Sequence, residues 1–292
     1  MNFGILLKEY LKQIENILDN MKIRIFKDKN YKGIYLNGKT LRLALNTKKP
    51  ILELDYPEFY DVKITDYCTG QCPYCYQNSM PNIAHYNNIV SKIQSFFGKM
   101  SENEKPFQVA IGGGNPNQHP DFIKALKIFY EMGITPNYTT NGIGLTLKVL
   151  NATKKYCGGV AVSTHEHLKE HWNKAINLLH NNTKLNLHHI ISDKTSIDKM
   201  KNILNSYNKY IEYIVLLPYI AQGRAEPKKI NYNYLEKTLD NMNINKIAFG
   251  AKFYNFVKKR KQKYDISLYE PEILSKYLDL KDMKIYKSSF ES

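Results

Sequence analysis

The chain has 292 residues, of which 43% are apolar and 24% are charged, and its net charge at neutral pH is +15. This composition excludes the disordered, collagen-like and disulfide-scaffold classes, and a chain of this length forms one or two domains with a sizeable core. Only four of the 42 basic residues are arginines, the residue that binds phosphate bidentately, so the charge indicates a general bias toward lysine while a nucleic acid or an acidic peptide stays open as a partner.

The first 56 residues form an extension ahead of the main domain. Apolar residues at helical spacing predict a helix over residues 3–20. Residues 22–54 change to strand-like alternation, and the pair Asn37-Gly38 predicts a tight antiparallel turn, because both residues of such a turn tolerate positive φ. We therefore expect residues 1–56 to be a helix followed by a small β-hairpin.

From about residue 57, predicted strands alternate with predicted helices. The strands are expected at 59–64, 107–112, 134–139, 158–163, 184–191, 211–217 and 245–249. The clearest helices are expected at 121–132, 166–180 and 195–207. Regular alternation predicts an α/β fold with a parallel sheet, and six or seven units favour a partial (β/α)6-type TIM barrel over a closed barrel of eight units.

Two helix ends and the limits of the core follow from the same pattern. Gly133 lies where the helix 121–132 should end, and Thr195 with Asp198 matches a capping box at the start of the helix 195–207. We expect the barrel core over residues 57–225 and a C-terminal extension, residues 226–292, that completes or covers the barrel. The basic run 258–263 is more typical of a solvated face than of a docking patch.

The cysteines indicate a metal centre. No run of 18 apolar residues occurs and the start lacks a signal peptide's features, so we expect a cytoplasmic protein with no membrane partner. In such a reducing compartment, three cysteines within eight residues are more typical of metal binding than of disulfides. The four cysteines are Cys68, Cys72, Cys75 and Cys157.

The first three cysteines are separated by intervals of four and three residues, a spacing that suits two kinds of metal centre. A structural zinc ion needs a fourth ligand, which would come from Cys157, His85 or His119. An iron–sulfur cubane is held by three thiolates with its fourth iron left open, and thiolates suit such clusters. An open iron is a reactive position, by the same logic that keeps catalytic zinc sites unsaturated.

The cysteine loop resembles that of the radical S-adenosylmethionine (radical SAM) superfamily. The loop has the pattern Cys-x3-Cys-x2-Cys, with the aromatic Tyr74 before the last cysteine, and it directly follows a predicted strand. The resemblance implies a [4Fe–4S] cluster on Cys68, Cys72 and Cys75, whose open iron chelates S-adenosylmethionine. Reductive cleavage of that cofactor then gives methionine and a 5′-deoxyadenosyl radical that abstracts a hydrogen atom. No cysteine follows Cys157, so we expect a single-cluster member without a SPASM or twitch-type auxiliary domain.

A glycine-rich segment after the second strand supports the resemblance. Residues 112–116 resemble the family's Gly-Gly-Glu-Pro segment, whose glycines allow a close approach to the cofactor amino group. Asn115 stands where the family most often has Glu or Asp, so its amide accepts a hydrogen bond without charge assistance.

Other strand ends complete the expected cofactor site. Residues 140–142 resemble the family's Thr-Asn-Gly segment, Ser163 ends the fourth strand, and apolar residues of the sixth strand flank adenine in the family. The resemblance assigns cofactor binding to Tyr74, Gly113, Gly114, Asn115, Pro116, Thr140, Asn141, Ser163, His189 and Leu217. All these motifs follow the carboxyl ends of strands, the end where active sites of α/β barrels form.

Other polar residues and the fourth cysteine are candidates for further roles. Adjacent strand residues point to opposite faces, so at most one of His188 and His189 points inward, and we favour His189. The candidates for a general base or hydrogen donor are His165, His189 and Tyr219. Arg224 is expected to bind a carboxylate or phosphate, or else to form a surface ion pair. Cys157 precedes the fourth strand, so we expect a buried residue at the opposite rim that is not a cluster ligand.

The sequence therefore predicts a radical SAM enzyme that acts on a peptide or protein. A nucleoside, a nucleic acid or a small metabolite is the alternative substrate. A non-catalytic, metal-containing nucleic-acid-binding module is the alternative of another class. The resemblance further implies an electron donor of the flavodoxin or ferredoxin type.

Overall fold

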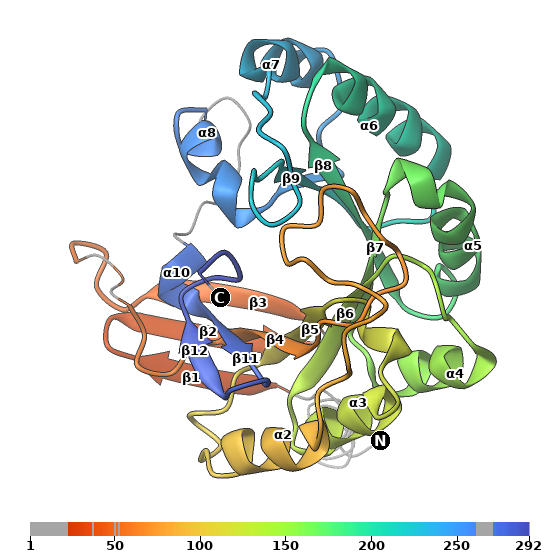
Figure 1. Cartoon of the computed structure of the whole chain (residues 1–292). Coiled ribbons are helices and arrows are strands. Elements are labelled where there is room, and N and C mark those ends of the chain that lie inside the picture. Colours follow the sequence, from red (N-terminus) through yellow and green to blue (C-terminus); the bar gives the residue numbers. More distant parts are fainter. Residues whose placement is uncertain (1–22, 37, 50, 52, 261–270, 292) are drawn as a thin grey trace, which may run out of the picture.

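The computed structural model describes residues 23–291 except 37, 50, 52 and 261–270 (Figure 1). The helix predicted over residues 3–20 and part of the basic run 258–263 lie outside the described residues. None of the described helices has both the length and the apolar character needed to cross a bilayer.

A small antiparallel sheet precedes the main domain. Its strands are β1 (Arg24–Asp28), β2 (Tyr31–Leu36) and β3 (Lys39–Ala44), in the order β1-β2-β3. The predicted hairpin corresponds to β2 and β3, in which Leu36 pairs with Lys39 and Gly38 has φ of 81°. Strand β1, which the hairpin prediction did not include, adds the third strand. One face of the sheet packs against the main domain, where the rings of Tyr35 and Phe107 stack at 5.3 Å.

The main sheet contains nine strands in the order β10-β9-β8-β7-β6-β5-β4-β11-β12. All seven predicted strands are present, and neighbours among them are parallel. The order leaves two ends, so the structure is an open, partial barrel, as predicted. The strands are β4 (Phe59–Thr65), β5 (Gln108–Gly113), β6 (Thr135–Thr140), β7 (Gly159–Ser163), β8 (Lys184–Ile191), β9 (Tyr213–Pro218) and β10 (Ile247–Phe249).

Helices follow one another along the outer face of the curved sheet (Figure 1). Each buries its apolar face in a core shared with the strands, as Phe122, Leu126 and Phe129 do from α3. The longer helices are α2 (Ile89–Phe97), α3 (Phe122–Glu131), α4 (Leu147–Tyr156), α5 (Lys169–Leu179), α6 (Lys194–Tyr207) and α7 (Tyr232–Asp240). Short turns are η1 (Pro116–Gln118), η2 (Glu166–Leu168), η3 (Ala251–Phe253), α8 (Tyr254–Lys258) and α10 (Pro271–Leu274).

The capping box of α6 differs from the prediction. The helix begins at Lys194, and its N-cap is Asp193, whose carboxylate accepts a hydrogen bond from the Ser196 backbone at 2.8 Å. The predicted pair of Thr195 and Asp198 is therefore wrong by two residues. The Asp193 carboxylate, two residues before Thr195, satisfies a free amide of the first turn, and Asp198 instead accepts a hydrogen bond from the Tyr234 hydroxyl of α7.

Two strands near the C-terminal end were not predicted. Strand β11 (Ser275–Asp279) runs parallel to β4, and β12 (Lys284–Tyr286) pairs antiparallel to β11. The register places Tyr277 beside Asp61 and Asp279 beside Lys63. The extension after residue 225 thus supplies three strands of the main sheet, β10 at one end and β11 with β12 at the other.

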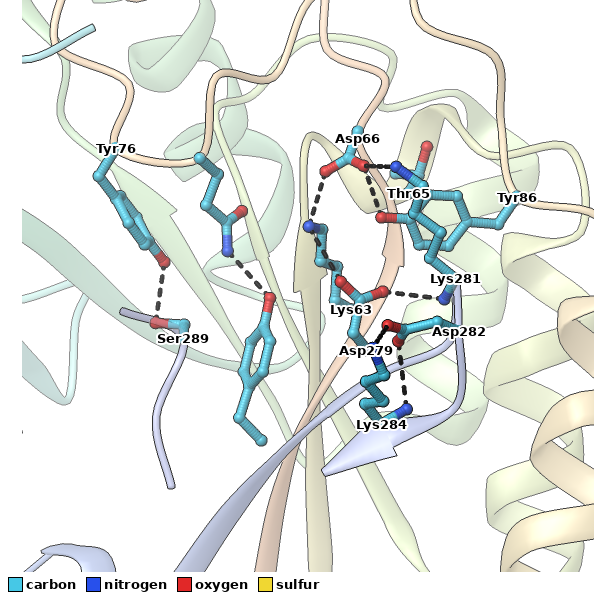
Figure 2. A network of polar contacts seen from close by, with 12 residues as sticks. Lys63, Thr65, Asp66, Tyr76, Tyr86, Asp279, Lys281, Asp282, Lys284 and Ser289 are labelled. Carbon is cyan, nitrogen blue, oxygen red and sulfur yellow. Dashed lines mark hydrogen bonds and ion pairs between the residues drawn. The ribbon is translucent and has the colours of Figure 1, made fainter. Parts of the chain in front are cut away.

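A buried ion-pair network joins β4, the start of the cysteine loop and β11 (Figure 2). The Lys63 ammonium lies 2.8 Å from Asp66 and 3.1 Å from Asp279, and all three side chains are about nine-tenths buried. Burial alone would lower the pKa of Lys63, but the hydrogen bonds and charges of the two carboxylates outweigh it and the net pKa is raised. The Tyr86 hydroxyl also donates to Asp66 at 2.6 Å. These contacts fix Asp66 two residues before the first cysteine.

We expect Lys63→Met to lower the free energy of unfolding by about 3 to 5 kcal/mol, because the change leaves two buried carboxylates without their cation. Urea unfolding followed by circular dichroism measures the loss. The matched control is Lys281→Met, which removes a mostly exposed lysine 3.9 Å from Asp66 and should cost under about 1 kcal/mol. Equal losses in the two variants would contradict the assignment.

Candidate functional site

A cavity of about 380 Å³ opens at the carboxyl ends of the parallel strands. We call it the central cavity. Its volume is within the range of small-molecule sites. The expected site residues that line it are Cys68, Cys72, Tyr74, Cys75, Gly113, Gly114, Thr140, Asn141, Ser163, His165, Leu217 and Tyr219. Asn115, Pro116 and His189 are not among its lining residues.

The loop between β4 and α2 brings the three cysteines to this cavity. Within the loop, the Cys75 amide donates to the Cys72 carbonyl at 3.2 Å and the Cys68 amide donates to the Met80 carbonyl at 3.3 Å. The Arg224 guanidinium donates to the carbonyls of Cys72 and Ser79, each at 3.0 Å. Arg224 therefore clamps the loop by its backbone, which differs from the ligand contact or surface ion pair that the sequence suggested.

The sulfurs of Cys68 and Cys72 lie in surroundings that favour the neutral thiol until a metal binds. Burial raises the pKa of Cys72 to about 12 and also raises the pKa of Cys68. The Cys68 sulfur accepts hydrogen bonds from the Gly70 amide at 3.3 Å and from the Asn141 amide group at 3.5 Å. Iron that binds here must displace thiol protons, since the thiolate is the ligand.

The residues present fit an iron–sulfur cluster better than a zinc ion. His85 hydrogen-bonds Thr65 at 3.0 Å and His119 hydrogen-bonds the Tyr86 carbonyl at 2.9 Å, so both candidate histidines are engaged elsewhere, and Cys157 does not line the cavity. Across the described ranges, no three Cys, His, Asp or Glu side chains are grouped closely enough to hold one metal ion. Thiolates of a cubane bind different irons and stand farther apart, and three of them leave one iron open.

The glycine-rich end of β5 packs directly on the start of the cysteine loop. A Cβ on Gly113, whose φ is 108°, would lie 2.3 Å from the Thr65 carbonyl, and one on Gly114 would lie 2.1 Å from the Tyr67 carbonyl. The Gly114 amide also donates to the Thr65 carbonyl at 2.7 Å. Only glycine fits at either position, because the two backbones touch. The glycines thus set the position of the loop besides lining the cavity.

The Asn115 side chain joins the end of β5 to the end of β6 instead of facing the cavity. Its side chain is only 1% exposed and donates to the Ile143 carbonyl at 2.9 Å. Its carbonyl oxygen accepts from the Thr140 hydroxyl at 3.1 Å and from the Asn141 amide at 3.4 Å. This placement differs from the expected contact with a cofactor ammonium group. The following Pro116 is likewise buried, at the start of η1.

Two of the three candidate acid–base residues, His165 and Tyr219, line the cavity. The Tyr74 hydroxyl lies 3.2 Å from the His165 ring nitrogen Nδ1, which links the cysteine loop to the end of β7. Burial, reinforced by neighbouring histidines, lowers the pKa of His165 to about 4, so the ring is neutral at pH 7. The Tyr219 hydroxyl donates to the Glu226 carbonyl at 2.8 Å. Their roles in catalysis stay predictions.

The choice between the two strand histidines was wrong. His188 lines the central cavity, whereas His189 points to the helix side of β8. There His189 hydrogen-bonds the Thr164 hydroxyl at 2.8 Å and the Ser196 carbonyl at 2.8 Å. Leu185 and Leu187 are buried in the core on the helix side of the sheet, and His189 continues the same face of the strand. His188 therefore points to the opposite face, and this alternation could have identified it from the sequence.

Cys157 lies away from the cavity, as the sequence suggested. It is the C-cap residue of α4, just before β7, and it packs against the outer hydrophobic core. Burial raises the pKa of its thiol.

Several cavity residues were missed by the sequence analysis. Asp61 lies on β4, Tyr76 and Gln77 follow the last cysteine, and Tyr277, Ser289 and Phe290 come from the C-terminal extension. A lone carboxylate within an apolar strand was a signal for Asp61. The contribution of Tyr277, Ser289 and Phe290 depends on the long-range pairing of β11 with β4, which no local sequence pattern indicates.

His188 generates a prediction about acid stability. Burial lowers its pKa from 6.5 to about 4 in the folded protein. The unfolded chain therefore takes up this proton first, so folding stability decreases as pH falls from 6.5 toward 4. His188→Asn should flatten that part of the stability profile in urea titrations. The control His171→Asn changes an exposed histidine of α5 and should keep the slope of the parent. An unchanged slope in His188→Asn would contradict this.

Comparisons with known proteins agree with this geometry. The model of the radical SAM superfamily matches residues 62–219, more than half of the chain. No curated protein matches the chain.

Solved structures with similar folds include two of SuiB from Streptococcus suis. SuiB bound to S-adenosylmethionine aligns with TM-score 0.63 and 14% identity, over 81% of this chain and 61% of SuiB. SuiB bound to its precursor peptide SuiA aligns with TM-score 0.61 and 14% identity, over 82% of this chain and 61% of SuiB. The protein anSMEcpe with bound AdoMet and a Cp18Cys peptide aligns with TM-score 0.57 and 12% identity, over 80% of this chain and 75% of anSMEcpe.

The chain thus spans about three fifths of the length of SuiB, and at these identities the likeness concerns the fold. The family match covers the cysteine loop, the glycine-rich end of β5 and the strand ends around the central cavity. The chain belongs to the radical SAM superfamily, whose enzymes use a [4Fe–4S] cluster and S-adenosylmethionine as cofactors.

Proposed function

We propose that this enzyme holds one [4Fe–4S] cluster on Cys68, Cys72 and Cys75, binds S-adenosylmethionine beside it, and removes a hydrogen atom from a peptide substrate. The observation that supports this most directly is the convergence of the three cysteines and the glycine-rich end of β5 on one cavity. When bound, the reduced cluster and S-adenosylmethionine supply the one-electron chemistry that ends in hydrogen abstraction.

The chain's own residues bind and orient those groups. The backbone of Gly113 and Gly114 and the polar ends of β6 and β7, Thr140 and Ser163, face the cavity where a polar cofactor needs hydrogen bonds. Leu217 gives an apolar surface on the β9 side, suited to a nucleobase ring. The hydrogen bond between Tyr74 and His165 joins the cysteine loop to the end of β7 at one side of the cavity.

A peptide substrate is favoured by two observations. SuiB and anSMEcpe, which share the fold, are each known in a complex with a peptide. The cavity is also lined, beyond the expected cofactor residues, by Tyr277, Ser289 and Phe290 of the C-terminal extension, and we place the substrate against these residues. An acidic electron donor of the flavodoxin or ferredoxin type would be attracted by the net charge of +15.

We expect anaerobically reconstituted protein, reduced with dithionite and given S-adenosylmethionine, to release 5′-deoxyadenosine, detected by mass spectrometry. Cys72→Ser should lose bound iron and sulfide and form no 5′-deoxyadenosine, because a cluster ligand is removed. Cys157→Ser, the matched control, should keep the parent's iron content and activity. A colourless protein with one bound zinc ion, or loss of iron in the control, would contradict the proposal.

A further inference from the structure

One wall of the central cavity combines a carboxylate with aromatic rings. Asp61 lies on β4, four residues before the strand ends, so it is about 13 Å deeper along the strand than the start of the cysteine loop. Tyr277 is its neighbour on β11 in the strand register. Tyr76 and Phe290 line the same cavity, with ring centres 4.9 Å apart. We call these four residues the acidic wall.

Asp61 has no counter-charge in the part of the chain that the structure describes. No side chain or backbone group of that part donates a hydrogen bond to its carboxylate, and no described lysine, arginine or histidine forms an ion pair with it. Burial alone raises the pKa of Asp61 to about 7. The side chain is nevertheless open to the cavity, which it lines. A substrate that displaced solvent from this part of the cavity would make the carboxylate costly unless the substrate itself compensated the charge.

The rings of the acidic wall are held in place by contacts with the cysteine loop and the C-terminal extension. The Tyr76 hydroxyl donates to the Ser289 hydroxyl at 3.2 Å (Figure 2). The Gln77 side chain donates to the Tyr277 hydroxyl at 3.0 Å. Neither hydroxyl is used to solvate Asp61. The wall is therefore a fixed surface of rings around one carboxylate.

The other charged groups of the cavity do not neutralise Asp61. Among the described lining residues, Asp61 is the one carboxylate, and Lys252 is the one lysine. The Lys252 ammonium lies 5.2 Å from the centre of the Phe290 ring, and no ion pair joins it to Asp61. The lining histidines, His165 and His188, both have pKa values lowered to about 4 by burial and are neutral at pH 7.

We propose that the acidic wall, Asp61 with Tyr76, Tyr277 and Phe290, binds a positively charged side chain of the substrate, a lysine or an arginine. This inference rests on the proposed function for the peptide nature of the substrate. A bound cation supplies the missing counter-charge, and aromatic rings attract it through their faces. A neutral side chain of the same length would leave Asp61 uncompensated.

The test compares charged and neutral probes of equal length. Binding is measured by calorimetry on cluster-reconstituted protein saturated with S-adenosylmethionine, without reductant. The lysine arm uses Nα-acetyl-lysine methylamide against Nα-acetyl-norleucine methylamide. The arginine arm uses the corresponding arginine and citrulline compounds. We expect the charged probe of at least one arm to bind roughly tenfold more tightly than its neutral partner.

Variants assign the preference to Asp61. Asp61→Asn should bring the charged and neutral probes of that arm to within about twofold of each other. Asp198→Asn, which removes an exposed carboxylate on the outer helix α6, is the matched control and should keep the tenfold preference. The comparison of probes on the parent protein does not depend on the folding of either variant.

Several outcomes would overturn the inference. These are equal binding of both probes by the parent protein, no binding of any charged probe up to about 10 mM, or a preference that survives in Asp61→Asn. The inference would also be overturned if the parent protein showed no preference and Lys252→Met did, because Lys252 would then be the counter-charge of Asp61 in solution. Because no reductant is present, failure here is distinct from failure of the proposed function, which appears as missing 5′-deoxyadenosine in the parent protein.

Discussion

A single buried ammonium group connects the parts of this protein that must cooperate. Lys63 comes from the first strand of the barrel, and its two carboxylate partners come from the start of the cysteine loop and from β11. Charges in such surroundings are stable only in mutual contact, so the three segments cannot move apart independently. The cysteine loop and the C-terminal extension are thereby both held against β4.

The cysteine loop itself has little regular structure, and it depends on neighbours for its shape. Arg224 binds its carbonyls from beyond β9, and the glycines at the end of β5 touch its first turn. These supports come from segments far apart in the sequence. A metal site needs ligands held to within a fraction of an ångström, and here the rigidity comes from surrounding strands rather than from the loop.

Much of the barrel and the metal ligands could be predicted from the sequence. The alternation of strand-like and helix-like segments identified all seven parallel strands from β4 to β10, because each strand buries the apolar residues of one face against the helices. The missed features depend on partners distant in sequence. Strand β11 is short and carries Lys276 and Asp279, whose partners lie over 200 residues away. The direction of His188 could have been predicted from the phase that the buried Leu185 and Leu187 give to β8. The place of Asn115 could not, because its side chain binds the end of β6.

The pairing of β4 with β11 also has a consequence for biosynthesis. The ribosome adds about 210 residues between the two strands, so at usual elongation rates the open edge of β4 waits roughly 10 to 40 s for its partner. An open strand edge is a template for pairing between chains, and neighbouring nascent chains on one messenger RNA present the same edge to each other. The side of the central cavity lined by Tyr277, Ser289 and Phe290 is accordingly completed only after these residues have left the exit tunnel.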